Sequence, residues 1–180
     1  MKENVLILQI KHGNQKALNT LISHYYPSIY RYIYLKIYTK EDAADITQEV
    51  FLRFIRQIPT YHHQGKLLNY LYTIAHSCCI DYIRKQKHFE DWENYENEIA
   101  DPINVHVSTL DQIEWETMNR LLKKLSLRQQ DVIIFHLYQQ MTFKEIAKIL
   151  NEPEETIKSC FYRAIRKLRL LWKEENHERD

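Results

Sequence analysis

The chain has 180 residues, of which 44% are hydrophobic and 27% are charged. These proportions are ordinary for a globular protein and exclude extensive disorder. Only 2 glycines and 4 prolines are present, too few for the tight turns of an all-β fold or for a glycine-rich nucleotide loop. The apolar runs are shorter than the ~20 residues of a membrane-spanning helix, and the polar N-terminus lacks the pattern of an export signal. Composition therefore predicts a helical, soluble, cytoplasmic protein without membrane insertion.

Charge is distributed unevenly along the chain. Residues 1–88 carry a net charge of +6, residues 89–117 carry −9 with no Lys or Arg, and residues 118–180 carry +4. Basic domains commonly bind nucleic acid, although a run of charge is as often a solvated surface. We expect two basic domains, 1–88 and 118–180, joined by an acidic linker at 89–117.

The first helical signals lie on either side of a proline. Apolar residues recur at helical spacing over residues 17–25 and again over residues 29–36. Pro27 lies between these stretches, and we expect it to break the helix because proline lacks an N–H group and clashes with the preceding turn. The tyrosines at alternate positions after Pro27 would also suit a strand.

Two longer helices are expected next. Residues 40–58 place an apolar stripe opposite a polar face, and Pro59 follows them. A polar and aromatic loop at 61–66 precedes a second stretch of helical periodicity at 67–87. The sequence therefore predicts that the first domain consists of helices throughout.

The second domain has the layout of a helix-turn-helix over residues 142–168. Ser126 with Gln129, and Thr142 with Glu145, have the spacing of helix-capping boxes. A short turn then precedes a basic, amphipathic helix of the kind that enters the major groove of DNA. A simple antiparallel helix pair is the alternative, but the detailed pattern favours DNA binding.

The sequence carries no recognisable motif for covalent chemistry. His62 and His63 lack a carboxylate at a diagnostic spacing, and His76, Cys78 and Cys79 do not match a zinc signature. We therefore expect no enzyme activity, no catalytic residue, no metal and no cofactor. The three cysteines are expected to be small buried side chains without disulfides.

Two stretches, in a fixed order, resemble a known protein family. The chain resembles region two of bacterial extracytoplasmic-function (ECF) sigma factors over residues 42–56, DAADITQEVFLRFIR, and residues 67–85, LLNYLYTIAHSCCIDYIRK. Residues 121–169 resemble region four of the same family, from LLKKLSLRQQ to FYRAIRKLR. One helix-turn-helix would be weak support, but the ordered pair with a variable linker is specific.

The resemblance implies an all-α fold of two small helical domains joined by the acidic linker, the C-terminal one with the helix-turn-helix. It implies a sigma factor that binds core RNA polymerase, recognises the minus-35 and minus-10 promoter elements and helps to open the DNA. An anti-sigma factor is a further implied partner. A stand-alone helix-turn-helix transcriptional regulator is the alternative, and a structural helical adaptor is a weaker one. The region-two pattern favours the sigma factor, because a repressor has no use for a polymerase-docking helix.

The resemblance also implies three groups of site residues. Binding to core polymerase falls on Asp42, Asp45, Gln48 and Glu49. Binding to the minus-10 element falls on Tyr61, His62, His63, Tyr70 and Ser77, where the loop would cradle an extruded base. Binding to the minus-35 element falls on Glu155, Thr156, Lys158, Ser159, Tyr162 and Arg163. Glu155 either complements the helix dipole or accepts a hydrogen bond from a cytosine amino group, and the sequence leaves both open.

Overall fold

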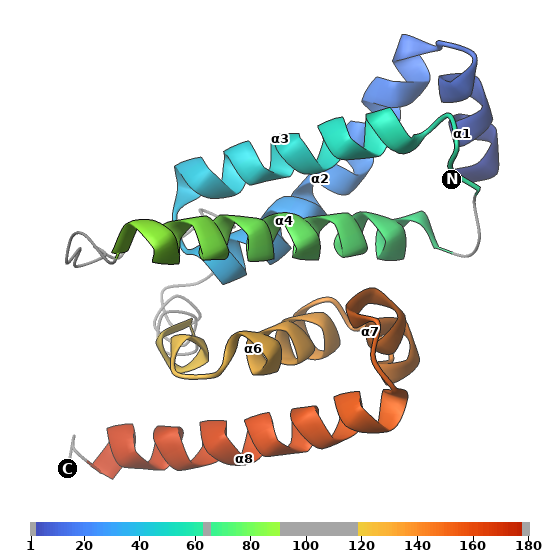
Figure 1. Cartoon of the computed structure of the whole chain (residues 1–180). Helices are drawn as coiled ribbons and strands as arrows, with labels where there is room; N and C mark the ends of the chain where they lie inside the picture. The colour runs from blue at the N-terminus through green and yellow to red at the C-terminus, as the bar shows by residue number, and fades with distance from the viewer. Residues whose placement is uncertain (1–2, 63–65, 91–118, 178–180) are drawn as a thin grey trace. The chain divides into compact units, whose positions relative to one another are not determined.

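The computed structural model describes residues 3–62, 66–90 and 119–177. Every regular element within these ranges is helical (Figure 1). None of the helices in these ranges is long and apolar enough to cross a membrane.

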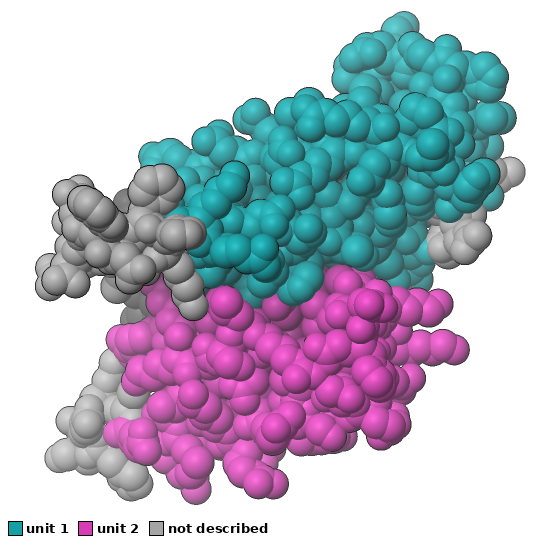
Figure 2. All heavy atoms as spheres, viewed as in Figure 1, with its two compact units in different colours: residues 1–98 teal, residues 99–180 magenta. Residues whose placement is uncertain are grey.

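The chain divides into two compact units, residues 1–98 and residues 99–180 (Figure 2). The prediction of an all-α fold with two helical domains is confirmed. The predicted acidic linker at 89–117 lies outside the described residues, except for its first two residues, which belong to the last turn of a helix. The domain boundaries next to this linker therefore stay predictions.

In the part of the first unit that the structure describes, the helices are α1 (Glu3–Lys11), α2 (Gln15–Ile37), α3 (Lys40–Gln57) and α4 (Leu67–Glu90). Helices α2, α3 and α4 pack against one another, and α1 packs on α2. Their buried side chains include Leu21, Ile29, Tyr32, Phe54, Leu71 and Tyr72. Burial of each such side chain contributes about 1.5–3 kcal/mol, so this core of aliphatic and aromatic side chains holds α2, α3 and α4 together.

Pro27 does not break α2, and the prediction of a break there is wrong. The helix continues through the proline, and Tyr25 and Ile29 on either side of it are both buried. Pro27 and Ser23 are exposed, so water can reach the Ser23 carbonyl that loses its helical partner. Burial of one continuous face outweighs the local cost of the proline, and the strand alternative for the following tyrosines is also wrong.

The described residues of the second unit contain a helical segment at 119–123, α6 (Leu127–Ile133), a π-helical turn (Ile134–Tyr138), α7 (Phe143–Leu150) and α8 (Glu154–His177). Its core cluster consists of Leu121, Leu122, Leu125, Ile133, Ala164 and Leu168. Both predicted capping boxes are present, at the starts of α6 and α7.

No pattern in the sequence indicated the π-helical turn. The N–H of Gln139 donates to the carbonyl of Ile134 over 3.1 Å, a bond that spans five residues instead of four. The turn directs His136 onto two aromatic rings, with centroid distances of 4.3 Å to Phe143 in α7 and 4.7 Å to Phe161 in α8. The turn therefore connects α6 to both helices of the helix-turn-helix.

Candidate functional site

The polar side of α3 presents an exposed surface that combines polar side chains with one apolar side chain. Asp45 and Gln48 are exposed, and Leu52, one turn beyond Gln48, is 48% exposed. Residues three and four apart lie on one side of a helix, so these three side chains form a continuous patch, the α3 surface. Leu52 was not among the predicted residues, although a leucine on an otherwise polar face was the signal for it.

Glu49 is half-buried at the edge of the α3 surface and is paired within the unit. It accepts a hydrogen bond from Arg53 Nε over 2.8 Å, and Arg53 Nη1 donates to Asp81 in α4 over 3.1 Å. The bond to Glu49 is the largest of the effects that raise the pKa of Arg53. Glu49 thus takes part in an ion-pair network that joins α3 to α4.

Asp42 also has partners within the first unit. Its carboxylate accepts a hydrogen bond from the hydroxyl of Thr39, the residue that precedes α3. Burial, followed by a hydrogen bond to Asp42, raises the pKa of Tyr82 to about 12. Asp42 therefore ties the residue that precedes α3 to the first turn of the helix, and its carboxylate is engaged within the unit.

An aromatic cluster lies where the chain passes from α3 to α4. The rings of Tyr61 and Tyr70 are 4.6 Å apart and half-buried, and Phe54 meets them edge-on at 6.0 Å and 6.3 Å. We name Phe54, Tyr61 and Tyr70 the Tyr61 cluster. The Tyr70 hydroxyl donates to Oε1 of Gln57, which orients its ring. Half-exposed aromatic faces of this kind suit stacking against an unpaired base.

The structure brings together two of the five predicted minus-10 residues, Tyr61 and Tyr70. His62 is exposed and follows Tyr61 directly in the chain. Ser77 is exposed two turns beyond Tyr70, on the same side of α4. His63 lies outside the described residues.

The exposed side of α8 groups three of the predicted minus-35 residues. Ser159, Tyr162 and Arg163 are all exposed, and Tyr162 is 62% exposed. Arg163 Nε donates to the carbonyl of Ser159 over 3.2 Å, which holds the guanidinium along the helix. Arg166 is exposed on the next turn of the same side and was absent from the predicted set, although the basic stripe of the sequence included it.

Lys158 is paired with two acidic residues of its own helix. Its Nζ atom lies 2.9 Å from Glu155 Oε1 and 3.0 Å from Glu154 Oε1. The hydrogen bond to Glu155, followed by the bond to Glu154, raises the pKa of Lys158. Glu155, whose role the sequence left open, is therefore an intramolecular partner of Lys158. Thr156, beside it, is half-buried.

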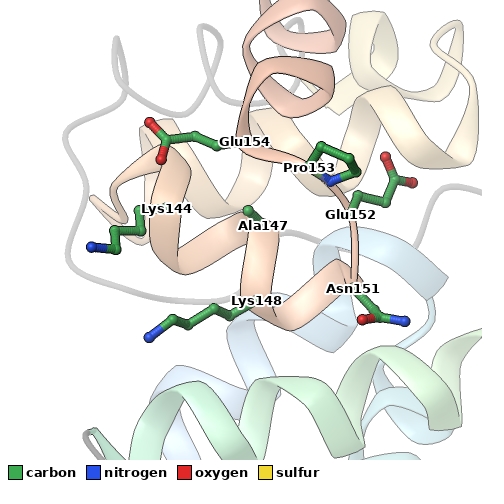
Figure 3. Close-up of a pocket in the computed structure, with 7 residues that line it drawn as sticks. All are labelled: Lys144, Ala147, Lys148, Asn151, Glu152, Pro153 and Glu154. Carbon is green, nitrogen blue, oxygen red and sulfur yellow. The ribbon is translucent and has the colours of Figure 1, made fainter.

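The turn between α7 and α8 sets the geometry of the helix-turn-helix. Asn151 ends α7 in the left-handed conformation, at φ 52°, which asparagine tolerates better than most residues. Figure 3 shows Lys144 and Lys148 of α7 extending to the same side of the hollow at this turn as Glu154. The first helix of a helix-turn-helix crosses the DNA backbone, so these two exposed lysines are further candidates that the sequence analysis missed.

The three cysteines are free and buried, as predicted. Burial raises the pKa of the Cys78 thiol to about 11. Within the described parts of the chain, no three His, Cys, Asp or Glu side chains come together as metal ligands would.

Two parts of the chain match known families. Residues 21–89 match Sigma-70 region 2, and residues 121–170 match Sigma-70, region 4. The ECF RNA polymerase sigma factor BldN of Streptomyces coelicolor is 30% identical over 171 residues, which are 92% of this chain and 64% of BldN. The ECF RNA polymerase sigma factor SigW of Bacillus subtilis is 29% identical over 173 residues, 91% of this chain and 92% of SigW. The chain belongs to the ECF sigma factor family.

A solved structure shares the fold of this sigma factor. It is the sigma factor RpoE in complex with the anti-sigma factor NepR from Bartonella quintana, with a TM-score of 0.74 and 20% identity over 88% of this chain and 98% of RpoE. ECF sigma factors are not enzymes: they direct RNA polymerase to promoters through regions 2 and 4. The predicted family and general function are therefore confirmed, and the individual site residues stay predictions.

Proposed function

We propose that this sigma factor docks on core RNA polymerase through the α3 surface. Leu52 supplies an apolar centre, and Asp45 and Gln48 supply a polar rim, the arrangement found in protein–protein interfaces. The charge of Asp45 would fix the register and speed the encounter. Glu49 and Asp42 would act behind this surface, by holding α3 against α4 and fixing its first turn.

The Tyr61 cluster would receive an unpaired base of the minus-10 element. Removal of a base from the DNA stack costs a few kcal/mol, and stacking on an aromatic side chain returns about 1–3 kcal/mol. Tyr61 and Tyr70 offer such faces, and the predicted residues His62 and His63 follow Tyr61 in the chain. Ser77 would contact the strand further along α4.

Helix α8 would read the minus-35 element from the major groove. Ser159, Tyr162 and Arg163 form the exposed patch, in which the guanidinium suits a guanine edge. Lys158 and the two lysines of α7 would bind phosphates, which position the helix without reading sequence.

We also propose an anti-sigma factor as a partner, since the RpoE relative was solved bound to one. Core polymerase and promoter DNA are found in the bacterial cytoplasm, so the proposed function assigns the chain to that compartment.

The observation that supports this function is that one chain matches regions 2 and 4 in that order, with the exposed α3 surface in the first and a basic helix-turn-helix in the second. The test adds purified protein to core polymerase and measures promoter-specific transcripts and co-purification. The triple variant Asp45→Ala, Gln48→Ala, Glu49→Ala is expected to lose co-purification and keep its helicity. The matched control Arg163→Ala is expected to keep co-purification and lose promoter selection. Undiminished co-purification of the triple variant would contradict the assignment of α3.

A further inference from the structure

Helix α1 has no role in the function described so far. It precedes the region-2 match at residues 21–89, and the sequence indicated nothing for it. Ile7 anchors it in the core of the unit. Its first and last residues, Glu3 and Lys11, form hydrogen bonds with Leu67 and Tyr61, which are far away in the sequence.

Lys11 holds the chain where it leaves α3. Its Nζ atom donates to the carbonyl oxygen of Tyr61 over 2.8 Å, across 50 residues of sequence. The contact is to the backbone of the residue whose ring belongs to the Tyr61 cluster. It therefore restrains the position of that ring without covering it.

Glu3 holds the chain where α4 begins. Its Oε2 atom accepts a hydrogen bond from the N–H of Leu67, the first residue of α4, over 3.0 Å. This N–H has no partner within its own helix, and a carboxylate at a helix N-terminus is favoured by the helix dipole. The other oxygen of Glu3 accepts from the hydroxyl of buried Tyr25 over 2.6 Å, which fixes the direction of the carboxylate.

The two contacts restrain the backbone at Tyr61 and at Leu67. Ordering a backbone residue costs about 1–2 kcal/mol, and a residue that is held before binding does not incur that cost on binding. The Glu3 carboxylate also lies close enough to Tyr61 to contribute, after burial, to the raised pKa of its hydroxyl. Helix α1 thus makes one hydrogen bond to the backbone of the Tyr61 cluster and places a carboxylate near its Tyr61 hydroxyl.

We propose that α1 is a positioning element for minus-10 recognition, in which Lys11 and Glu3 fix Tyr61 and the start of α4 before DNA arrives. The proposal rests on the proposed role of the Tyr61 cluster. If these contacts served stability alone, their loss would affect all promoters equally. A positioning role requires that their loss reduces discrimination between minus-10 sequences.

The test uses the full chain in holoenzyme, on promoters that differ by one minus-10 base pair at a time, with the rate of open-complex formation as the readout. Lys11→Met is expected to reduce the preference for the best minus-10 sequence about fivefold, the size of effect that follows from one lost hydrogen bond. Glu3→Leu is expected to reduce the preference for the best minus-10 sequence at least as much as Lys11→Met does. Lys11→Arg, which keeps a donor, and Lys16→Met, which removes another exposed lysine, are expected to keep the preference.

Tyr61→Ala separates failure of this inference from failure of the proposed site. If Tyr61→Ala loses discrimination while Lys11→Met and Glu3→Leu keep it, the positioning role is overturned and the site stands. Equal slowing of opening on every promoter by Lys11→Met also overturns the positioning role. If Tyr61→Ala keeps discrimination, the proposed site and the inference fall together.

Discussion

Leu52 offers a quantitative test of the α3 surface. The side chain is 48% exposed, so roughly half of it remains for a partner to cover. Full burial of a leucine contributes about 1.5–3 kcal/mol, so covering the remaining half would contribute about 1 kcal/mol. We expect Leu52→Ala to weaken the binding of core polymerase about fivefold. The free energy of unfolding is expected to fall by no more than about 1 kcal/mol, because only about half of the side chain is buried within the unit.

The measurement is competition between variant and unaltered protein for a limiting amount of core polymerase, with thermal unfolding followed in parallel. Leu8→Ala is the matched control, because Leu8 in α1 is 58% exposed and belongs to the same unit. It removes the same chemical group at a site away from the α3 surface. Equal affinities of the two variants for core polymerase would refute the reasoning.

Three further predictions concern α8, alkaline pH and the helix-turn-helix. Lys158→Ala is expected to weaken DNA binding by holoenzyme irrespective of sequence and to lower the log–log slope of its salt dependence by about one, because one phosphate contact is lost; an unchanged slope would contradict this. Stability to denaturant is expected to fall as the pH rises from about 9 to 11, because burial raises the pKa of Cys78 from 9.0 to about 11 and that of Tyr61 from 10.0 to about 12 in the folded chain. The unfolded chain releases these protons at lower pH than the folded chain, so the free energy of unfolding decreases as the pH rises. A free energy of unfolding that stays constant from pH 9 to pH 11 would contradict this prediction. Asn151→Ala is expected to lower the free energy of unfolding by about 1 kcal/mol, since alanine disfavours the left-handed backbone, and Asn151→Gly should not; calorimetry of both variants decides.

Local signals in the sequence located most of the helices. The apolar stripe of residues 40–58 predicted α3 because the same periodicity that places Val50 and Phe54 on one side also buries them. The capping boxes that begin at Ser126 and Thr142 predicted the starts of α6 and α7, since all their hydrogen bonds lie within three residues. Contacts of such short range can be predicted because both partners lie close together in the sequence.

The features that the sequence did not predict depend on distant parts of the chain. Glu49 and Asp45 look alike in the sequence, but only Glu49 lies where Arg53 bridges it to another helix. The hydrogen bond from the N–H of Leu67 to the Glu3 carboxylate joins residues that are 64 positions apart, and no periodic pattern in the sequence predicts it. The rule that a proline breaks a helix counts only the lost backbone hydrogen bond and the steric clash. It takes no account of the buried side chains of Tyr25 and Ile29, which lie on either side of Pro27 and keep α2 continuous.

The π-helical turn at Ile134–Tyr138 sets the direction in which the following residues of the second unit point. It holds one residue more than an α-helical turn, and one residue corresponds to a rotation of about 100°. Deletion of a single residue there would restore α-helical spacing and swing His136 away from Phe143 and Phe161. The direction in which the DNA-reading helix leaves the rest of its unit therefore depends on the count of residues in this turn as well as on their chemistry.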